Sequence, residues 1–454
     1  MSQHERRGVS IGTVFMLLLT LVVLIGCAIV MPRLMGKANI RMEDRAMHSS
    51  TNLNDSLPEL VMSDIPLTGT QPTAEPTIIP PVATATPEPS PEVTPVADAT
   101  PEPQISGTVV LTFGGSINMD DLTRKSGFYS DSDKYDYTDN LALIADEMDS
   151  DITLVTLESI TDPDGYVRQV PNAPDEVMDM LASAHVDVVA LGFNRALERG
   201  LDGATATIGQ ASLRGLETLG LYDSPEDASR IRIIEVHGVK VAYLHYATAI
   251  TTTAKRKMNT DDASYAMPVI SVSNGAERIA ADIGKARDEG ANVVVVSINW
   301  SGSDSITTTS TKMKNFMQAL ADAGADVIIG AGTKAVKEVS WFMGNRADGT
   351  THQTLCAWSL GSLLNGERNN GNVTGMLLHL QISVTGSSVN FERVSYTPTY
   401  IWRFKSDDYY RYRVVASDQP APEGMDETHA GNASRAFQRL KETLKSSPVT
   451  LRTK

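Results

Sequence analysis

The chain has 454 residues, enough for one large domain or two ordinary ones with additional segments. Its formal net charge is −16 at pH 7, and no basic stripe interleaved with aromatic residues occurs, which argues against a nucleic-acid partner. Only two cysteines are present, Cys27 and Cys356, so the chain cannot have a framework of several disulfides.

The first feature in chain order is an uncharged apolar run, VSIGTVFMLLLTLVVLIGCAIVM, over residues 9–31. It is long enough to cross a bilayer as a helix, and it predicts a single-pass membrane anchor after a short cytoplasmic segment, residues 1–8. A cleaved signal peptide is one alternative, although the apolar core of a signal peptide is normally shorter. Lipidation of Cys27 is another, because LIGC at residues 24–27 resembles a bacterial lipobox.

Residues 32–106 are predicted to form a disordered stalk rich in proline and threonine. The stretch PLTGTQPTAEPTIIPPVATATPEPSPEVTPVADATPEPQ has no apolar period, so it cannot bury enough surface to offset the entropy of ordering it. Its dense proline favours extended polyproline II, which acts as a semi-rigid spacer. Anchor and stalk together predict a protein of the cell membrane whose main domain is extracellular.

Strand and helix patterns alternate from Gly107 onward, which predicts a layered α/β domain over residues 107–404. Residues 405–454 are predicted to be a C-terminal extension with one helix. The later strands have few helices between them, which indicates antiparallel pairing and a mixed sheet system. The predicted strands cover residues 107–115, 151–158, 186–194, 232–247 (two strands joined at His237-Gly238), 291–300, 325–332, 354–360, 374–384 and 387–398; the predicted helices cover residues 174–184, 202–220, 273–290, 311–324 and 430–447.

Polar residues follow several of the buried strands, and in α/β domains ligands bind at the carboxyl ends of the strands. The strand tips therefore define a candidate pocket. Its predicted members, in chain order, are Ser116, Glu158, Asn194, Arg195, Glu198, Asn299, Trp300, Thr333 and Lys334.

The framework between these tips resembles the bacterial capsule synthesis protein CapA family, over roughly residues 107–400. The resemblance lies in PNAPDEVMDMLASAHVDVVALGFNRALERGLDG, IIEVHGVKVAYL and ALADAGADVIIG, and in SLGS at residues 359–362. The family is associated with poly-gamma-glutamate capsule biosynthesis, and its fold is similar to calcineurin-type metallophosphoesterases. The resemblance therefore implies an α-β-β-α sandwich of that kind, attached to the N-terminal transmembrane helix.

The polar tips depart from the family pattern. Ser116 stands where the family has Asp, Arg195 and Asn299 stand where it has His, and the last loop, GAGTKAV, contains no His. Family relatives would be expected to bind a divalent metal, but these side chains do not replace imidazole and carboxylate ligands. The resemblance implies a degenerate site with no metal cofactor and no assigned catalytic residue. The remaining histidines lack paired spacing and are expected to be structural: His185, His237, His245, His352 and His379.

Two cationic side chains are expected near the position where family relatives would bind the metal. Arg195 and Lys334 are expected to pair with Glu158 and Glu198, or to bind an anionic ligand such as a carboxylate or phosphate of an envelope polymer. The alternative is that both side chains point to solvent.

Three functions remain open at this point. The first is a membrane-anchored protein of capsule or envelope polymer biosynthesis that binds a polymer or a synthase complex without metal catalysis, that is, a pseudoenzyme. The second is an active metal-dependent hydrolase or amide-bond enzyme of the metallophosphoesterase superfamily, with an unfamiliar metal site, that uses Glu158 and Glu198. The third is a stalked scaffold whose pocket is irrelevant.

Overall fold

The computed structural model describes residues 106–161, 170–300, 306–346, 349–368, 371–406 and 409–453. The described residues belong to one compact unit, Val96–Lys454, and the other unit, Met1–Pro95, lies outside them. The predicted anchor, Cys27 and nearly all of the predicted stalk therefore fall outside the described residues. Within the described ranges, no helix is both long and apolar enough to span a bilayer.

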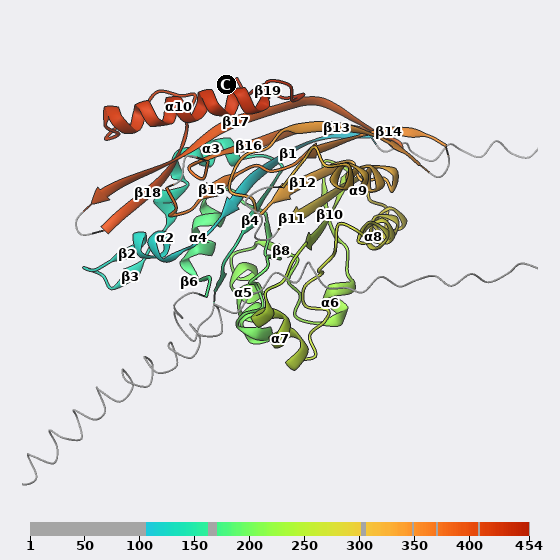
Figure 1. Ribbon diagram of the computed structural model, residues 1–454, viewed down its shortest axis with the longest axis horizontal. Helices are drawn as coiled ribbons and strands as arrows, with labels where there is room; N and C mark the ends of the chain where they lie inside the picture. Colours follow the sequence, from blue (N-terminus) through green and yellow to red (C-terminus); the bar gives the residue numbers. More distant parts are fainter. Residues whose placement is uncertain are drawn as a thin grey trace, which may run out of the picture. The chain divides into compact units, whose positions relative to one another are not determined.

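A mixed sheet of nine strands forms the first of two large sheets (Figure 1). Its order is β18-β17-β16-β1-β4-β7-β8, with β15 beside β1 and β19 beside β17. The neighbours β1, β4, β7 and β8 run parallel, whereas β16, β17 and β18 pair antiparallel. The strands are β1 (Ser106–Ile117), β4 (Ile152–Leu157), β7 (Val188–Ala190), β8 (Glu217–Leu219), β15 (Ser362–Leu364), β16 (Thr374–Thr385), β17 (Ser388–Ser406), β18 (Tyr409–Ala416) and β19 (Thr450–Leu451).

The second large sheet has six strands in the order β13-β14-β12-β11-β10-β9. Its centre is parallel, and the edge strands β9 and β13 are antiparallel to their neighbours. β11 reads VVVVSIN and is buried along its whole length, as expected of a parallel strand covered on both faces. The strands are β9 (Arg232–Val236), β10 (Val239–Ala247), β11 (Val293–Asn299), β12 (Val327–Ala331), β13 (Val339–Asn345) and β14 (Thr351–Ala357).

Helices and short pairs complete the unit. Two minor sheets are formed by β2 (Phe128–Tyr129) with β3 (Lys134–Tyr135) and by β5 (Ile160–Thr161) with β6 (Asn172–Ala173). The helices are α2 (Asp121–Ser126), α3 (Ala145–Met148), α4 (Glu176–Ser183), α5 (Gly200–Ser212), α6 (Pro225–Ser229), α7 (Thr252–Thr260), α8 (Ala276–Asp288), α9 (Thr311–Asp322) and α10 (Glu427–Leu444), with 3-10 turns η1 (Thr138–Asn140) and η2 (Ala142–Ile144).

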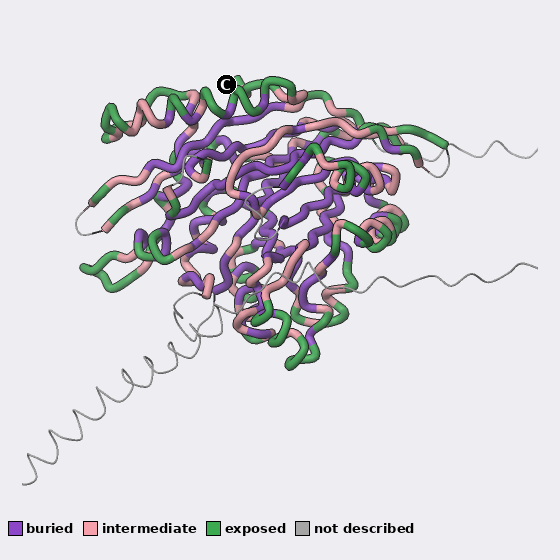
Figure 2. Tube along the Cα trace, viewed as in Figure 1, coloured by how far each residue is buried: buried purple, intermediate pink, exposed green. Residues whose placement is uncertain are grey.

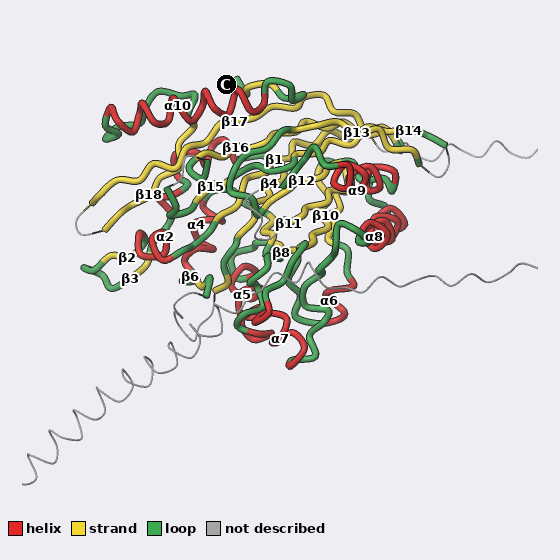
Figure 3. The backbone as a smooth tube through the Cα atoms, in the orientation of Figure 1, coloured by secondary structure: helices red, strands yellow, loops and turns green. Residues whose placement is uncertain are grey.

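The two sheets pack face to face through one apolar cluster. Leu111 and Leu154 of the first sheet contribute to it together with Val295 and Ile329 of the second. Two further clusters bury the outer faces, one with α4 and α5 on the first sheet and one with α8 and α9 on the second. Figures 2 and 3 show the buried strands between exposed helices. This arrangement confirms the predicted α-β-β-α layers of a mixed α/β fold.

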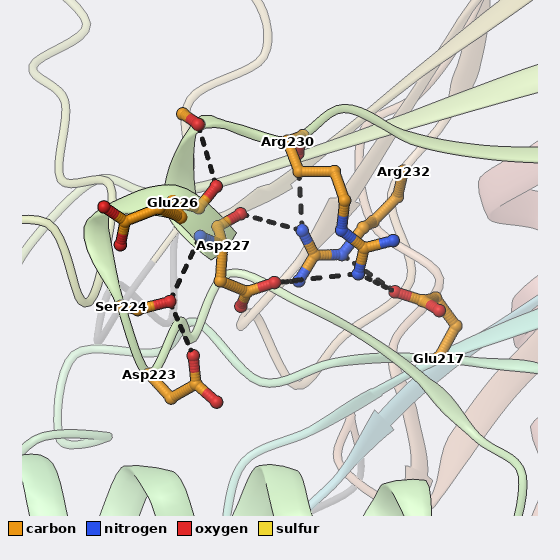
Figure 4. Close-up of polar contacts among 8 residues, drawn as sticks. Glu217, Asp223, Ser224, Glu226, Asp227, Arg230 and Arg232 are labelled. Atoms are coloured by element: carbon orange, nitrogen blue, oxygen red, sulfur yellow. Dashed lines mark hydrogen bonds and ion pairs between the residues drawn. The ribbon is translucent and has the colours of Figure 1, made fainter.

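A polar cluster joins neighbouring edges of the two sheets (Figure 4). Arg232 of β9 is 3% exposed and donates to Asp227 Oδ1 at 2.7 Å. Its Nε lies 2.8 Å from Glu217 Oε1 on β8, at the distance of an ion pair but without hydrogen-bond geometry. Arg230 approaches the same Glu217 carboxylate at 3.2 Å. The crossover from β8 to β9, which passes from one sheet to the other, is thus fixed by charge as well as by apolar packing.

The boundaries of most elements follow the predicted pattern, with one helix drawn too long. The predicted helix over residues 202–220 ends at Ser212, because the chain turns at Gly215 with φ +74° and enters edge strand β8. The hairpin at His237-Gly238 forms as expected, with positive φ at both positions. Among the elements that were not predicted, the longest are helix α7 and the strands β18 and β13.

The first sheet continues beyond residue 404. β17 runs to Ser406, β18 returns beside it, and α10 packs on β16 and β17. Leu440 and Leu444 of α10 join the cluster between the sheets. The C-terminal segment is therefore packed into the same compact unit as the preceding strands.

Candidate functional site

The carboxyl ends of strands from both sheets meet at one edge of the unit. Gly332, just after β12 of the second sheet, donates its backbone N–H to Ser116 Oγ on β1 of the first at 3.1 Å. Asn299, at the end of β11, donates its amide to Glu158 Oε1, just after β4, at 2.9 Å. The predicted strand tips are therefore brought together across the two sheets, and these two hydrogen bonds join them.

Glu158 and Asn299 form the centre of this group. Asn299 is fully buried, and its backbone carbonyl accepts a hydrogen bond from the backbone N–H of Thr248 at 2.9 Å. Glu158 is partly buried, and its backbone N–H donates to Ile117 O at 2.7 Å. Burial raises the pKa of the Glu158 carboxyl, while the hydrogen bond from Asn299 and the charge of Lys334 oppose that rise. Glu158 can thus hold a proton more readily than an exposed glutamate does.

The direct partner of Lys334 differs from the one expected. Its ammonium pairs with the Glu367 carboxylate, not with Glu158, and the two side chains are 25% and 45% exposed. Glu367 also accepts from Asn372 Nδ2 at 2.9 Å. Lys334 still acts on Glu158 through its charge. The expected pairing with a carboxylate therefore forms, but with a residue that lies after β15.

Arg195 and Glu198 form the second expected pair. Arg195 donates to Glu198 Oε2 through Nη2 at 2.7 Å and through Nε at 3.1 Å. Thr251, which caps α7, donates its hydroxyl to Glu198 Oε1 at 2.9 Å, and its backbone N–H donates to Asn194 O. The Arg195 side chain is 36% exposed and that of Glu198 is 9% exposed. This pair therefore presents a cation at the surface over a buried carboxylate.

Trp300 and Thr333 are buried behind the tips and support the backbone. Trp300 donates its indole N–H to Trp358 O at 2.9 Å. Thr333 donates to Ser359 Oγ at 2.6 Å, and the backbone N–H of Gly361 donates to the same Ser359 oxygen at 3.1 Å. These contacts occupy the polar atoms of both side chains, so they hold the loops in place and leave little for a ligand.

The donor set at the strand tips does not fit a divalent metal. Ser116 Oγ accepts a backbone N–H, Glu158 supplies a single carboxylate, and Lys334 adds a positive charge. Across the described parts of the chain, no three His, Cys, Asp or Glu side chains gather closely enough to hold a metal ion. A metal centre needs several such ligands. The absence of a metal cofactor stays a prediction.

Two buried histidines near the sheets have structural partners. His245 Nε2 lies 2.8 Å from Gly192 O, which can only accept, so Nε2 carries the proton and Nδ1 accepts from Ser297. Burial lowers the pKa of His245 to about 4. Burial, with the nearby Arg452, lowers the pKa of His379 to about 3. Both rings are neutral at pH 7.

Sequence reasoning missed Thr251 and Glu367. Thr251 follows β10, whose tip was not read with the other parallel strands, although ATAITTT offers several hydroxyls there. Glu367 lies after the short strand β15, and only the folded chain brings it to Lys334. A complete reading of the parallel strand tips would have found the first residue but not the second.

The comparison with protein families settles the relationship. The model of the family described as "Bacterial capsule synthesis protein PGA_cap" matches residues 110–367, more than half of the chain. The chain belongs to this family. The PGA_cap match includes every predicted tip residue and ends before β16.

Two curated relatives of this PGA_cap member are similar over part of their length. The "PGA biosynthesis protein CapA" of Bacillus subtilis (strain 168) is 25% identical over 190 residues, 42% of this chain and 45% of that protein. The "Capsule biosynthesis protein CapA" of Bacillus anthracis is 28% identical over 162 residues, 35% of this chain and 37% of that protein. Each match spans less than half of the relative's length.

Among solved structures, one similar chain is "Termus thermophilus Sulfate thiohydrolase SoxB in complex with glycerol". The sequences are 13% identical, the TM-score is 0.31, and the match covers 65% of this chain and 43% of the other.

Proposed function

We propose that this PGA_cap protein is a membrane-tethered, extracytoplasmic component of capsule or envelope polymer biosynthesis that binds an anionic polymer without metal catalysis. The observation that carries the proposal is the pair of surface cations at the strand tips. Arg195 and Lys334 are partly exposed and each is paired with a carboxylate of the chain itself. A carboxylate of a polymer can replace Glu198 or Glu367 in such a pair.

Arg195 and Lys334 bind the anionic polymer in this proposal, and Glu158, Asn299 and Ser116 support them. Arg195 presents a planar fork suited to a carboxylate, and Lys334 a compact point charge. Glu158, held by Asn299 and with its pKa raised by burial, adds little negative charge to oppose an anionic ligand when it is protonated. Ser116 joins the two sheets beneath these residues. The rim of the binding surface thus carries two cations, each balanced by a carboxylate of the chain that an anionic ligand can replace.

A titration with short poly-gamma-glutamate oligomers tests the proposal. We expect Arg195→Ala and Lys334→Ala each to weaken binding about tenfold, which corresponds to about 1.4 kcal/mol. Lys314→Ala, which removes an exposed lysine from α9, is the matched control and should leave affinity unchanged. Equal affinities for the wild-type protein and the two pocket variants would exclude polymer binding at this site.

An active hydrolase or amide-bond enzyme is the second candidate, favoured by the raised pKa of Glu158, which suits a general acid. Its proposed partner Glu198 is already bonded to Arg195 and Thr251. Metal analysis of the purified protein, together with a turnover assay on Glu158→Gln, separates the candidates. A stoichiometric bound ion, or turnover that Glu158→Gln abolishes, would overturn the binding proposal.

The tether is proposed on sequence grounds alone. Mass spectrometry of the N-terminus of the protein from membranes should detect residues 1–31 intact. Detection of a diacylated Cys27 at a new N-terminus would show that a lipid, and not a transmembrane helix, attaches the protein to the membrane. Cleavage without lipid would contradict both forms of membrane attachment.

A further inference from the structure

Two adjoining cavities lie away from the strand tips, at the β2–β3 hairpin. The larger, about 430 Å³, is lined by Tyr129, Ser132, Lys134, Tyr135, Asp136, Thr138, Glu176 and Asp179. The smaller, about 100 Å³, is lined by Ser126, Tyr129, Asp136, Asp139, Asn140, Phe404, Ser406, Arg411, Tyr412 and Arg413. Tyr129 and Asp136 line both, so the two cavities share one wall. Figure 1 shows the hairpin beside α2, α4 and the end of β18.

The smaller cavity contains a buried amide with no partner. Asn140 is 4% exposed, and its Nδ2 makes no hydrogen bond within the described residues. The Tyr412 hydroxyl, on the same wall, is also without hydrogen-bond geometry, although the Arg403 guanidinium lies near it. A buried donor left unpaired costs about 1–3 kcal/mol. An acceptor that reached the Asn140 amide at this cavity would remove that cost.

Two arginines add positive charge at this end. The Arg411 guanidinium stacks 4.1 Å from the Tyr129 ring centroid and 5.7 Å from that of Tyr409, and it also donates to Ser126 O. Arg413 is paired with Asp139 at 2.8 Å. Aromatic faces and a backbone carbonyl hold the Arg411 guanidinium in place. No carboxylate of the described residues forms an ion pair with it. The acceptor that fits this end is an anionic group, and a carboxylate has the required geometry.

The larger cavity carries the opposite charge at its far end. Glu176, the first residue of α4, is partly buried and has no side-chain partner among the described residues. Burial raises the pKa of the Glu176 carboxyl and the neighbouring Asp175 and Asp179 add to that rise, whereas a hydrogen bond from its own backbone N–H and the charge of Arg214 oppose it. Asp179 is neutralised by Arg214 at 2.8 Å, whereas Lys134 on the hairpin is exposed. An ammonium group placed beside Glu176 and the Tyr135 ring would be favoured both by charge and by the ring face.

We propose that these two cavities form one binding site for a zwitterionic amino-acid or short-peptide ligand. Its carboxylate lies against Arg411 and Asn140, and its ammonium lies against Glu176. The site differs from the strand-tip site, and part of its wall comes from β17 and β18, which lie beyond the residues that the family model matches. The combined space suits a ligand of about two residues, within the usual range of small-molecule pockets.

Calorimetric titration of the full-length protein with γ-glutamyl-glutamate and with its N-acetyl derivative tests this site. The derivative lacks the ammonium charge and carries an added acetyl group, so we expect it to bind at least fivefold more weakly than the free dipeptide; the Glu176→Gln variant below separates the effect of the charge from that of the added bulk. Equal affinities for the two ligands, or no binding of the free dipeptide at about 1 mM, the weak end of the affinity scale, would overturn the proposal.

Two nearly isosteric variants locate the charges. Glu176→Gln should abolish the preference for the free dipeptide, whereas Glu277→Gln, which changes an exposed first-turn glutamate of α8, should keep it. Asn140→Asp places a carboxylate against that of the ligand and should weaken both ligands at least tenfold. If Asn140→Asp does not fold, the Glu176 comparison remains decisive, because a preference that survives Glu176→Gln contradicts the assignment. Arg195→Ala should not alter dipeptide binding, which separates this site from the strand tips.

Discussion

At the scale of single residues, the hydrogen bond from Asn299 to Glu158 is one of the two contacts described above that tie the ends of the two sheets together. Asn299 is fully buried, so removing its amide leaves the partly buried Glu158 carboxylate without that donor. We predict that Asn299→Ala lowers the free energy of unfolding by about 1–3 kcal/mol, the cost of an unsatisfied buried group, measured by urea denaturation.

The control for this prediction is Asn274→Ala, at an exposed position before α8. It should change stability by less than about 0.5 kcal/mol. In a double-mutant cycle with Glu158→Ala, a coupling free energy near zero would show that the two side chains do not stabilise each other.

The sequence was enough to predict which residues lie at the strand tips, but not which side chains they contact. The positions of Ser116, Glu158 and Asn299 follow from where apolar strands end, and these three residues do converge. The partner of Lys334 depends on how the loop after β15 folds back, which no local pattern encodes. Long-range side-chain partners are therefore the part of the site that only the folded chain supplies.

At the scale of elements, strongly periodic segments were predicted well and short edge elements were not. α8, α9 and β11 match their patterns because each buries one continuous apolar face or run. β8 has only three residues and lies just after α5, so its Leu219, with Leu216 before it, extends the helical spacing and hides the break at Gly215. β18 was missed because its aromatic and arginine residues alternate without the usual apolar run.

The link between edge strands β8 and β9 gives a prediction at this scale. Arg232 is 3% exposed, whereas Asp227 and Glu217 are 19% and 37% exposed, so Arg232→Met leaves two carboxylates in partly buried surroundings. We predict a loss of about 2–3 kcal/mol, below the range of about 3–5 kcal/mol for a fully buried broken pair. Thermal and urea denaturation measure it.

Arg230→Met is the matched control within the same cluster. Arg230 is 57% exposed and contacts the same carboxylates, so its loss should cost less than about 1 kcal/mol. If the two variants lose the same free energy of unfolding, the burial of Arg232 does not strengthen its ion pairs.

At the scale of the whole molecule, the two-sheet architecture sets the pH dependence of stability. Burial within the sheets lowers the pKa of His245 to about 4 and, with Arg452 nearby, that of His379 to about 3. An unfolded histidine titrates near 6.5. Between about pH 6.5 and pH 4 the unfolded chain therefore binds more protons at these two positions than the folded chain does.

The sign follows directly from that difference in proton binding. The contribution of each histidine is complete above about pH 6.5, and it falls by about 1.4 kcal/mol per pH unit as the pH drops towards the folded value. Glu158 and Glu176 act in the opposite sense, because their pKa values are raised and their contribution is lost as the pH rises. The total slope is therefore smaller than two histidines alone would give.

Single substitutions isolate the histidine contribution from that of the carboxylates. We predict that His245→Gln lowers the slope of unfolding free energy against pH between 6.5 and 4 by about 1 kcal/mol per unit, measured by urea denaturation at several pH values. Asn274→Gln, at an exposed position before α8, changes no titratable group and should keep the wild-type slope. An unchanged slope in His245→Gln would mean that the ring protonates within the folded sheets, and that the packing around β10 opens to admit the charge.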